Sequence, residues 1–330
     1  MRRASVIRLT LLACLWGASF LFIKVALRGL SPVQIVLGRL ALGAAVLLVV
    51  VALRREPLPR NRTQWGHLAV AAVVANIIPY FLFGWGEQRI SSALAGVLNA
   101  TTPLFTLVFA LATRTEPRTT AVRVAGLLLG FAGALVVMAP WRAGIGAGSL
   151  SGQAACLLAA ASYGVSYVYM RRFLTGRGLP PLALAASQLT VATALLALAA
   201  PIVARTPITL TGDVVASILA LGALGTGIAY LLNYRLIADE GATAASTVTY
   251  LLPIVAVLLG ILALGEPLTW NVVVGTALIL AGVALAEGRI GRRAGANYGP
   301  ALRRLRPLAS RTSDCEVLGD AWHLVDEASG

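Results

Sequence analysis

Residues 91–103 of this 330-residue chain read SSALAGVLNATTP, and residues 241–253 read GATAASTVTYLLP. The two stretches occupy corresponding places in a longer doubled pattern, because segment 87–138 recurs about 150 residues later as segment 234–287. Both copies end in a stretch rich in alanine and glycine. A pattern of long apolar segments that occurs twice predicts a protein built from two related halves.

The composition of the chain indicates which medium surrounds the folded protein. Apolar residues make up 58% of the sequence, charged residues make up 12%, and the mean hydropathy is +0.83. A water-soluble domain of this length does not reach these values, so the surrounding medium is lipid. Lipid offers the backbone no hydrogen-bond partners, and continuous apolar runs select helices over a barrel. The sequence therefore predicts an all-α integral membrane protein.

Apolar runs of about 20 residues, each long enough to cross roughly 30 Å of hydrocarbon, define the predicted membrane spans. Short connections with helix-breaking pairs such as Ser31-Pro32 and Pro180-Pro181 separate them, which is typical of antiparallel neighbours in a bundle. Ten transmembrane helices are expected, over residues 7–28, 33–53, 66–86, 91–112, 120–139, 151–170, 181–204, 213–235, 242–264 and 270–287.

The doubled pattern divides these spans into two sets of five. The openings of the two sets also match, since WGASF at residues 16–20 aligns with YGVSY at residues 163–167. An odd number of spans in each half makes the second half enter the membrane upside down relative to the first. We therefore expect two inverted five-helix repeats, over residues 1–140 and 150–288, followed by a basic and polar cytoplasmic tail over residues 289–330.

The arginines set the expected orientation, because short cytoplasmic connections of membrane proteins carry an excess of Lys and Arg. With the N-terminus inside, 14 arginines lie on the cytoplasmic side and 4 on the outer side. Both termini are therefore predicted to be cytoplasmic. The cytoplasmic set is Arg2, Arg3, Arg8, Arg54, Arg55, Arg60, Arg62, Arg114, Arg118, Arg123, Arg171, Arg172, Arg177 and Arg235, and the outer set is Arg28, Arg89, Arg142 and Arg205.

The net charge of +14 does not indicate a nucleic-acid partner, because the arginines are spread over the ends of the spans rather than gathered on one face. Several arginines between residues 289 and 306 form a basic run after the last span. This run can rest on anionic headgroups of the inner leaflet, or it can be a solvated tail. The lipid bilayer is the expected macroscopic partner.

Cysteine and histidine are too scattered for a metal site. Cys14, Cys156 and Cys315 have no paired spacing, and His67 and His323 lie far apart. The spans also offer no pair of aspartates and no nucleophile with a nearby base. We therefore expect no catalytic residue, no metal and no cofactor, and we do not expect an enzyme.

Several short motifs recur in a fixed order along the chain. They are LWGASF at residues 15–20 with Lys24, Arg39 in the second span, SSALAGVLNATTP at 91–103, GTGIAY at 225–230, GATAASTVTYLLP at 241–253 and GEPLT at 265–269. In these motifs the chain resembles the EamA-type permeases of the drug/metabolite transporter superfamily. The resemblance covers almost the whole chain, up to about residue 288. The resemblance implies ten helices in two five-helix repeats, a central cavity, and a secondary transporter that often exports amino acids or related metabolites.

Two cations inside the predicted spans are the first candidates for substrate binding, because a charge within a membrane helix is costly. Lys24 is the only lysine, and Arg39 lies about two turns into the second span. We expect both to attract an anionic group such as a carboxylate, which arginine binds through two parallel hydrogen bonds. Snorkelling to the outer interface is the alternative for Lys24. The repeat partner of Arg39 is Gln188, a neutral candidate for the same cavity.

Small polar residues and prolines mark two further stripes of candidate cavity residues. They are Asn99, Thr102 and Pro103 in the fourth span and Thr249, Tyr250 and Pro253 in the ninth. The prolines free backbone carbonyls near the midplane, where a substrate can use them. The alternatives are that the polar side chains only join helices and that the prolines are ordinary kinks.

Aromatic residues within the spans are candidates for the walls or gates of the cavity. They are Trp16, Phe20, Tyr80, Tyr163, Tyr167 and Tyr230, with the amide of Asn233 near the last of them. Packing within the bundle is the alternative interpretation of each ring.

Glu87, near the outer end of the third span, is the candidate for ion coupling. It can pair with Arg89, or it can take up protons if it faces inward.

Glycines in the fifth and tenth spans have the spacing that lets helices approach closely. They are Gly126, Gly130, Gly133, Gly275 and Gly282. We expect them to hold the scaffold together, and the seam of a homodimer is a second use of the same surface.

Inverted repeats around a central cavity suit alternating access. Together with the resemblance to the EamA-type permeases, which implies export of amino acids or related compounds, this predicts a permease that moves small-molecule metabolites. One lysine beside 26 arginines indicates a GC-rich bacterial genome, and hence the cytoplasmic (inner) membrane of a bacterium. A passive channel or a membrane sensor on the same scaffold is the alternative.

Overall fold

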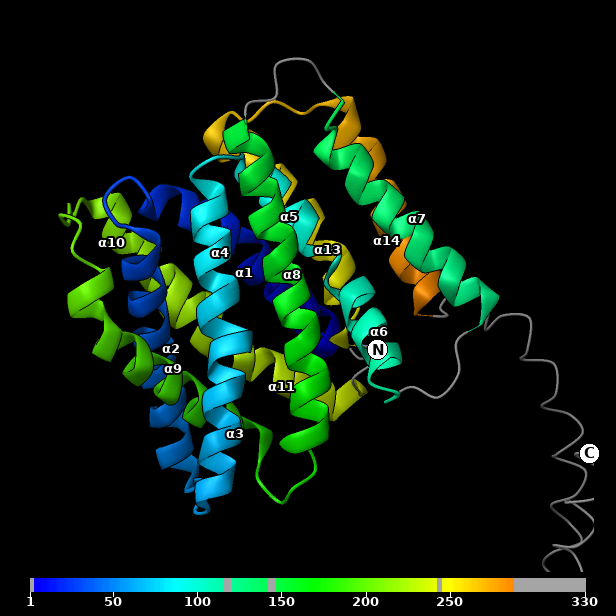
Figure 1. Cartoon of the computed structure of the whole chain (residues 1–330). Coiled ribbons are helices and arrows are strands. Elements are labelled where there is room, and N and C mark those ends of the chain that lie inside the picture. The colour runs from blue at the N-terminus through cyan, green and yellow to red at the C-terminus, as the bar shows by residue number, and fades with distance from the viewer. Residues whose placement is uncertain (1–2, 116–119, 142–146, 242–244, 288–330) are drawn as a thin grey trace, which may run out of the picture. The chain divides into compact units, whose positions relative to one another are not determined.

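The computed structural model describes residues 3–115, 120–141, 147–241 and 245–287, which form helices with no β-strand among them (Figure 1). The helices are α1 (Arg3–Ala26), α2 (Pro32–Arg54), α3 (Arg62–Ala72), η1 (Val73–Ile77), α4 (Ile78–Glu87), α5 (Ser92–Asn99), α6 (Thr102–Ala112), α7 (Ala121–Met138), α8 (Ala147–Phe173), α9 (Pro181–Val203), α10 (Gly212–Leu219), η2 (Ala220–Ile228), α11 (Ala229–Glu240), α13 (Val248–Leu264) and α14 (Trp270–Ala286). The predicted tail over 289–330 lies outside the described residues.

The predicted all-helical architecture is confirmed for the described residues, and each predicted span overlaps one helix or a run of consecutive helices. Within those residues, seven segments are long and apolar enough to cross a membrane: Arg3–Ala26, Pro32–Arg54, Arg62–Glu87, Ser92–Ala112, Ala121–Met138, Pro181–Val203 and Gly212–Glu240. α13 and α14 are apolar and have 17 residues each. Leu53, Leu198 and Leu262 are 78%, 79% and 80% exposed, which suits contact with lipid.

The predicted break at Ser31-Pro32 is the start of α2, and local hydrogen bonds explain it. The Ser31 hydroxyl accepts a hydrogen bond from the Gln34 backbone N–H, and the Gln34 side-chain oxygen accepts one from Ser31 N at 2.8 Å. Pro32 occupies the first turn, where its missing N–H has no partner to lose.

Two of the long helical segments contain a π-helical stretch. η1 continues α3 into α4, and η2 continues α10 into α11. Residues 73–77 correspond to residues 223–227 at the repeat distance of 150, so the two stretches occupy matching places just before Tyr80 and Tyr230. A π-helical turn widens the helix locally and is frequent at functional sites.

Helices from the two predicted halves pack against each other throughout the bundle. α1 packs on α13 and α11, α2 on α9 and η2, α5 on α13, and α6 on α8. Figure 1 shows α4 (cyan) running beside α8 (green), which also pack together. The two predicted halves are therefore interleaved among the described helices.

α7 and α14 form a close pair through their glycines (Figure 1). A Cβ added at Gly282 would lie 2.4 Å from the Gly130 backbone nitrogen, and one added at Gly133 would lie 2.9 Å from the Gly275 carbonyl oxygen. Larger residues here would push the helix backbones apart. The glycines thus serve the scaffold within one chain, and a homodimer stays a prediction.

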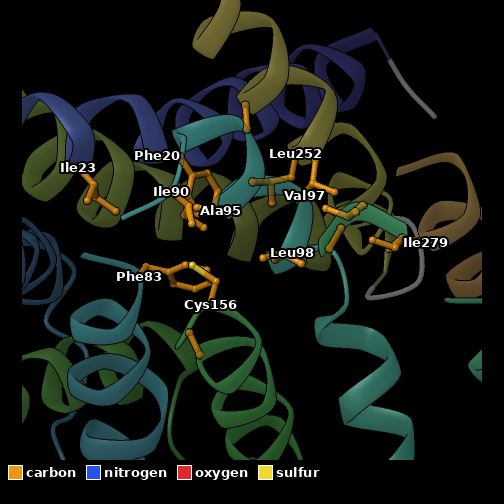
Figure 2. Close-up of a cluster of buried hydrophobic side chains, with 14 of the residues drawn as sticks. Phe20, Ile23, Phe83, Ile90, Ala95, Val97, Leu98, Cys156, Leu252 and Ile279 are labelled. Atoms are coloured by element: carbon orange, nitrogen blue, oxygen red, sulfur yellow. The ribbon is translucent and has the colours of Figure 1, made fainter. Parts of the chain in front are cut away.

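A cluster of buried apolar side chains lies near the connection between α4 and α5 (Figure 2). Phe20 and Ile23 from α1 meet Phe83 from α4 and Ile90 from the α4–α5 connection, and all four are buried. We call the end of the bundle that carries residues 27–31, 88–91, 204–211 and 265–269 the α4–α5 end. Hydrogen bonds join these connections, for example from Thr209 N to the Gly29 carbonyl at 2.9 Å.

Candidate functional site

A cavity of about 620 Å³ lies between helices of the two predicted halves. Its wall is built mainly from α1, α2, α4, α6, α8, α11 and α13. The structure brings twelve of the predicted cavity residues together there: Trp16, Phe20, Arg39, Tyr80, Asn99, Thr102, Pro103, Tyr163, Tyr167, Tyr230, Asn233 and Thr249. Residues more than 200 positions apart in the sequence thus face one space.

Arg39 is the charged group deepest in the cavity wall, with 7% of its surface exposed. Its Nε donates a hydrogen bond to the Thr226 hydroxyl at 2.9 Å, and its guanidinium carbon lies 4.0 Å from the centre of the Tyr80 ring. No carboxylate forms an ion pair with Arg39 in the part of the chain that the structure describes. A cation held by one bond and one ring retains donors for an anionic ligand.

Aromatic rings form an apolar wall beside this guanidinium. Tyr80 and Tyr163 meet edge to face with ring centres 6.5 Å apart, and Phe83 lies 6.2 Å from Tyr163. Phe20 and Phe83 also meet edge to face, at 5.4 Å, and Figure 2 shows both among the side chains of the apolar cluster. Such pairs add directional contacts to the burial of apolar area. This part of the site therefore combines the buried positive charge of Arg39 with a broad apolar surface.

The predicted kink at Pro103 is a full break in the helix. α5 ends at Asn99 and α6 begins at Thr102, with Pro103 in its first turn. The Thr102 hydroxyl donates to the Asn99 carbonyl at 2.8 Å, and the Thr106 hydroxyl donates to the Thr102 carbonyl at 2.9 Å. Their hydroxyl protons are used in these bonds to backbone carbonyls, and both residues line the cavity, so what their hydroxyl groups can still offer is an oxygen acceptor.

Gln188 does not line the cavity, contrary to the expectation from its repeat partner. It is buried between helices, and its side-chain nitrogen donates to the Asn76 side-chain oxygen at 2.5 Å. This contact mirrors that of Arg39. Arg39 and Gln188 each belong to the second span of their predicted half. Each bonds to a polar residue in the π-helical stretch of the other predicted half: Arg39 to Thr226 in η2, and Gln188 to Asn76 in η1.

Sequence reasoning missed Asn76 and Thr226, although the signal was present. Both are polar residues within apolar spans, and they lie 150 positions apart, at the repeat distance. Each is fully buried.

Lys24 also lies outside the cavity wall. Its ammonium donates to the Glu87 carbonyl and, at 2.7 Å, to the Ile90 carbonyl, so it fastens α1 to the α4–α5 end. The reason is its position along α1. Lys24 follows Phe20 by four residues and lies one turn nearer the helix end, where the carbonyls of Glu87, at the end of α4, and of Ile90, in the connection after it, are within reach.

Glu87 does not pair with Arg89. The Glu87 side chain is fully buried, whereas the exposed Arg89 guanidinium lies 3.6 Å from the Trp85 ring centre and donates to the Trp85 carbonyl at 2.9 Å. Residues two positions apart around a helix end point in different directions, which explains the separation. Neither carboxylate oxygen of Glu87 has a hydrogen-bond partner among the described residues.

Tyr250 and Pro253 lie behind the cavity wall. The Tyr250 hydroxyl donates to the Glu287 carboxylate at 3.0 Å, and Glu287 itself lines the cavity. Pro253 is buried within α13 and leaves the carbonyl of Thr249, a cavity residue, without its helical donor.

Two arginines that the sequence analysis counted among the cytoplasmic charges line the cavity. Arg123, near the start of α7, and Arg171, in the last turn of α8, line the end of the cavity away from Phe20 and Phe83. The sequence analysis used them to predict orientation, and neither was predicted to line the cavity.

Glu266 has a structural role that the sequence left open. Its two carboxylate oxygens accept hydrogen bonds from the backbone N–H groups of Ser92 and Ala93, at 2.7 and 2.9 Å. It therefore caps the N-terminus of α5, where a negative charge is favourable. Its repeat counterpart Glu116 lies outside the described residues.

No group of three or more His, Cys, Asp or Glu side chains within the described ranges is placed to hold a metal ion. The polar chemistry of the cavity is that of recognition by charge, hydroxyl, amide and aromatic groups.

Comparison with known proteins adds independent findings. The pattern of the EamA-like transporter family matches residues 4–139 and again residues 150–287. An uncharacterized transporter of Archaeoglobus fulgidus is 29% identical over 280 residues, which are 83% of this chain and 95% of that protein. An uncharacterized protein of Pseudomonas aeruginosa is 30% identical over 290 residues, 87% of this chain and 96% of that protein.

Two further likenesses bear on function and fold. A probable terminal-alkyne amino-acid exporter of Streptantibioticus cattleyicolor is 27% identical over 286 residues, 86% of this chain and 94% of that protein. A solved crystal structure superposes with a TM-score of 0.63 at 22% identity, over 89% of this chain and 99% of that one, which shows a shared fold.

Proposed function

Because this chain belongs to the EamA-like transporter family, we propose that it is a secondary transporter that exports a small metabolite, an amino acid or a related compound, by alternating access. Relatives named as transporters support transport rather than enzymatic catalysis. The relative named as a probable amino-acid exporter supports the substrate class.

The observation that carries the substrate class is the buried Arg39 in an aromatic cavity. Its guanidinium suits the carboxylate of an amino acid, because arginine donates two parallel hydrogen bonds to a carboxylate. The rings of Tyr80, Tyr163 and Phe83 suit the apolar part of the same molecule. The preferred ligand is therefore a small anion or zwitterion with an apolar side.

We also propose that ten helical crossings form two inverted repeats, over residues 1–140 and 150–288. The double match to the family pattern supports this arrangement. So do the matching places of η1 and η2 and the mirrored contacts of Arg39 with Thr226 and of Gln188 with Asn76. With the N-terminus inside, as the arginine distribution favours, the α4–α5 end faces the outside of a bacterial cytoplasmic membrane.

In that orientation the described conformation opens inward. Arg123 and Arg171 line the cavity at its cytoplasmic end, while Phe20, Phe83 and their apolar neighbours separate the cavity from the outer side. An inward opening below a closed outer end supports alternating access, in which a fixed site is exposed to one side at a time.

The first test is untargeted metabolite profiling of the medium of cells that express the full chain. Wild type, Arg39→Ala and an empty vector are compared at matched membrane abundance. Arg205→Ala is the matched control, because this arginine is exposed at the end of α9, bonded to the Pro201 carbonyl and outside the cavity wall. We expect a carboxylate-containing compound to be enriched by wild type and Arg205→Ala only.

The compound found in this way is then used for counterflow in proteoliposomes. Saturable counterflow supports a carrier, whereas flux that is linear in concentration and shows no counterflow supports a passive channel. Equal export by wild type and Arg39→Ala would remove the proposed substrate site. Absence of any enriched compound, together with uptake in the opposite direction, would overturn export.

A further inference from the structure

Glu87 is a buried carboxyl group that the transport site described so far does not use. It ends α4, is fully buried, and both of its carboxylate oxygens lack a hydrogen-bond donor among the described residues. An ionised carboxylate buried in this way is strongly disfavoured, because it has lost water and gained no partner. The described conformation therefore fits a neutral carboxyl group.

Three charged side chains surround Glu87, from α1, α2 and the α13–α14 connection, and each is bonded to a group other than the Glu87 carboxyl. Lys24 of α1 donates to the carbonyls of Glu87 and Ile90, and Glu266 caps α5. Arg39 of α2 bonds to Thr226. These three charged side chains lie near enough to interact electrostatically with Glu87. Glu87 in turn lies near enough to interact with the Cys156 thiol of α8. None of them gives its carboxyl group a direct partner.

The position of Glu87 links the cavity to the outer surface. Glu87 follows Phe83 by four residues, as Lys24 follows Phe20, so both lie one helical turn beyond the edge-to-face ring pair that bounds the cavity. On the other side the next two residues, 88 and 89, are exposed. One turn of helix therefore separates Glu87 from the cavity, and the chain reaches the surface immediately after it.

Building on the proposed transport function, we propose that Glu87 binds a proton from the outer side and that the outer end of the bundle closes over the protonated form. The carboxylate takes up one proton from outside water while the α4–α5 end is open. The resulting carboxylic acid is buried as Lys24 fastens α1 to the Glu87 and Ile90 carbonyls. Lys24 is a positioning residue in this scheme, and the proton is the coupling ion.

The direction of this step suits an exporter. Protons enter bacterial cells down their gradient, so an outer-side site that must be protonated before the carrier turns inward couples that gradient to outward movement of substrate. A sodium ion fits less well, because the Lys24 ammonium already occupies the two carbonyls beside Glu87.

The native Cys156 provides a probe of this closure that needs no substrate. Its thiol is buried in α8, and a Cβ added at Gly86, the residue before Glu87, would lie 2.7 Å from the Cys156 sulfur. In a full-length Cys14→Ser, Cys315→Ser background, Cys156 is the single cysteine. Its modification by a membrane-impermeant thiosulfonate is followed in right-side-out vesicles at fixed internal pH while the external pH is varied.

Glu87→Gln is the main variant, because glutamine matches the protonated side chain and cannot titrate. Comparison with Glu87→Gln also removes the rise in thiol reactivity with pH that is common to all variants, because the thiolate is the reactive form. We expect equal rates for wild type and Glu87→Gln at about pH 5.5, and at least about tenfold faster labelling of wild type at about pH 8.5. Glu87→Asp, which retains a titrating group, should remain pH-dependent. Lys24→Met should raise labelling at both values.

Parallel pH profiles for wild type and Glu87→Gln would overturn the proton site. So would a profile that follows external sodium at constant pH. Transport assays distinguish failure of the proton site from failure of the proposed transport function. Counterflow needs a working carrier but no pH gradient, so Glu87→Gln should retain counterflow and lose substrate accumulation driven by a pH gradient. Wild type without counterflow would remove the transport function, whatever the labelling shows.

Discussion

Replacing Glu266 by alanine should destabilise the N-terminus of α5, because it removes the acceptor of two backbone hydrogen bonds. The Glu266 carboxylate is the acceptor for the backbone N–H groups of Ser92 and Ala93, at 2.7 and 2.9 Å. Ser92 and Ala93 are buried, so water cannot easily replace the lost acceptors. The contact joins residues 174 positions apart and thus ties the α13–α14 connection to the fourth predicted span.

The expected cost follows from two contributions. Loss of an N-terminal cap costs about 0.5–2 kcal/mol, and loss of a negative charge at a helix N-terminus costs about 0.3–1 kcal/mol. Two buried donors lose their partner together, which places the free energy of unfolding about 2–3 kcal/mol lower in Glu266→Ala. Glu266→Gln retains one acceptor oxygen and should lose about half as much.

Equilibrium unfolding in mixed micelles, followed by tryptophan fluorescence, measures the global effect. Hydrogen exchange of the segment that contains Ser92 and Ala93 measures the local one, and it should accelerate. Glu56→Gln is the matched control, because Glu56 also lies at a span end but makes only a 3.9 Å contact with Arg54. It should change stability by less than about 0.5 kcal/mol. Unchanged exchange at residues 92 and 93 in Glu266→Ala would refute the capping argument.

Three further predictions concern contacts between helices. Gly282→Ala should lower the unfolding temperature and folded yield, because its Cβ would lie 2.4–2.5 Å from the α7 backbone, whereas Gly66→Ala, with nothing within 4 Å, should be neutral or stabilising by up to about 1 kcal/mol; equal effects would contradict the packing. Gln188→Leu should cost about 1–3 kcal/mol by stranding the buried Asn76 oxygen, and adding Asn76→Leu should recover part of it in a double-mutant cycle; strict additivity would show that the pair is not coupled. Thr226→Val should remove the acceptor that orients Arg39 and weaken substrate affinity in counterflow with little change in folded yield; unchanged affinity would argue that the arginine needs no such support.

Much of the candidate site was predictable, because the doubled pattern and the motifs mark the spans that meet at the centre. Arg39 was chosen as a charge within a span and Tyr80 and Tyr230 as aromatic residues within spans, and all three line one cavity. Lys24 was also chosen as a charge within a span, and it lies outside the cavity. The difference is one helical turn along α1, which hydropathy does not resolve.

Residues that act through distant partners were harder to identify. Glu266 resembles any carboxylate at a span end, and only the position of α5 makes it a cap. Asn76 and Thr226 were visible as polar residues at the repeat distance, but their partners on α9 and α2 were not. Which side of a helix meets which neighbour depends on its rotation in the bundle.

The lipid solvent, the helical class, the approximate ends of the spans and the family could all be predicted without a structure. Each of these rests on composition, on runs of about 20 residues or on local motifs, which are properties of the chain read in order. Three facts required the tertiary structure: neither carboxylate oxygen of the buried Glu87 has a hydrogen-bond partner among the described residues, Lys24 joins α1 to the α4–α5 end, and Arg39 faces an aromatic wall. These facts depend on contacts between residues 41 to 187 positions apart, and a contact of that kind is fixed by how the helices pack.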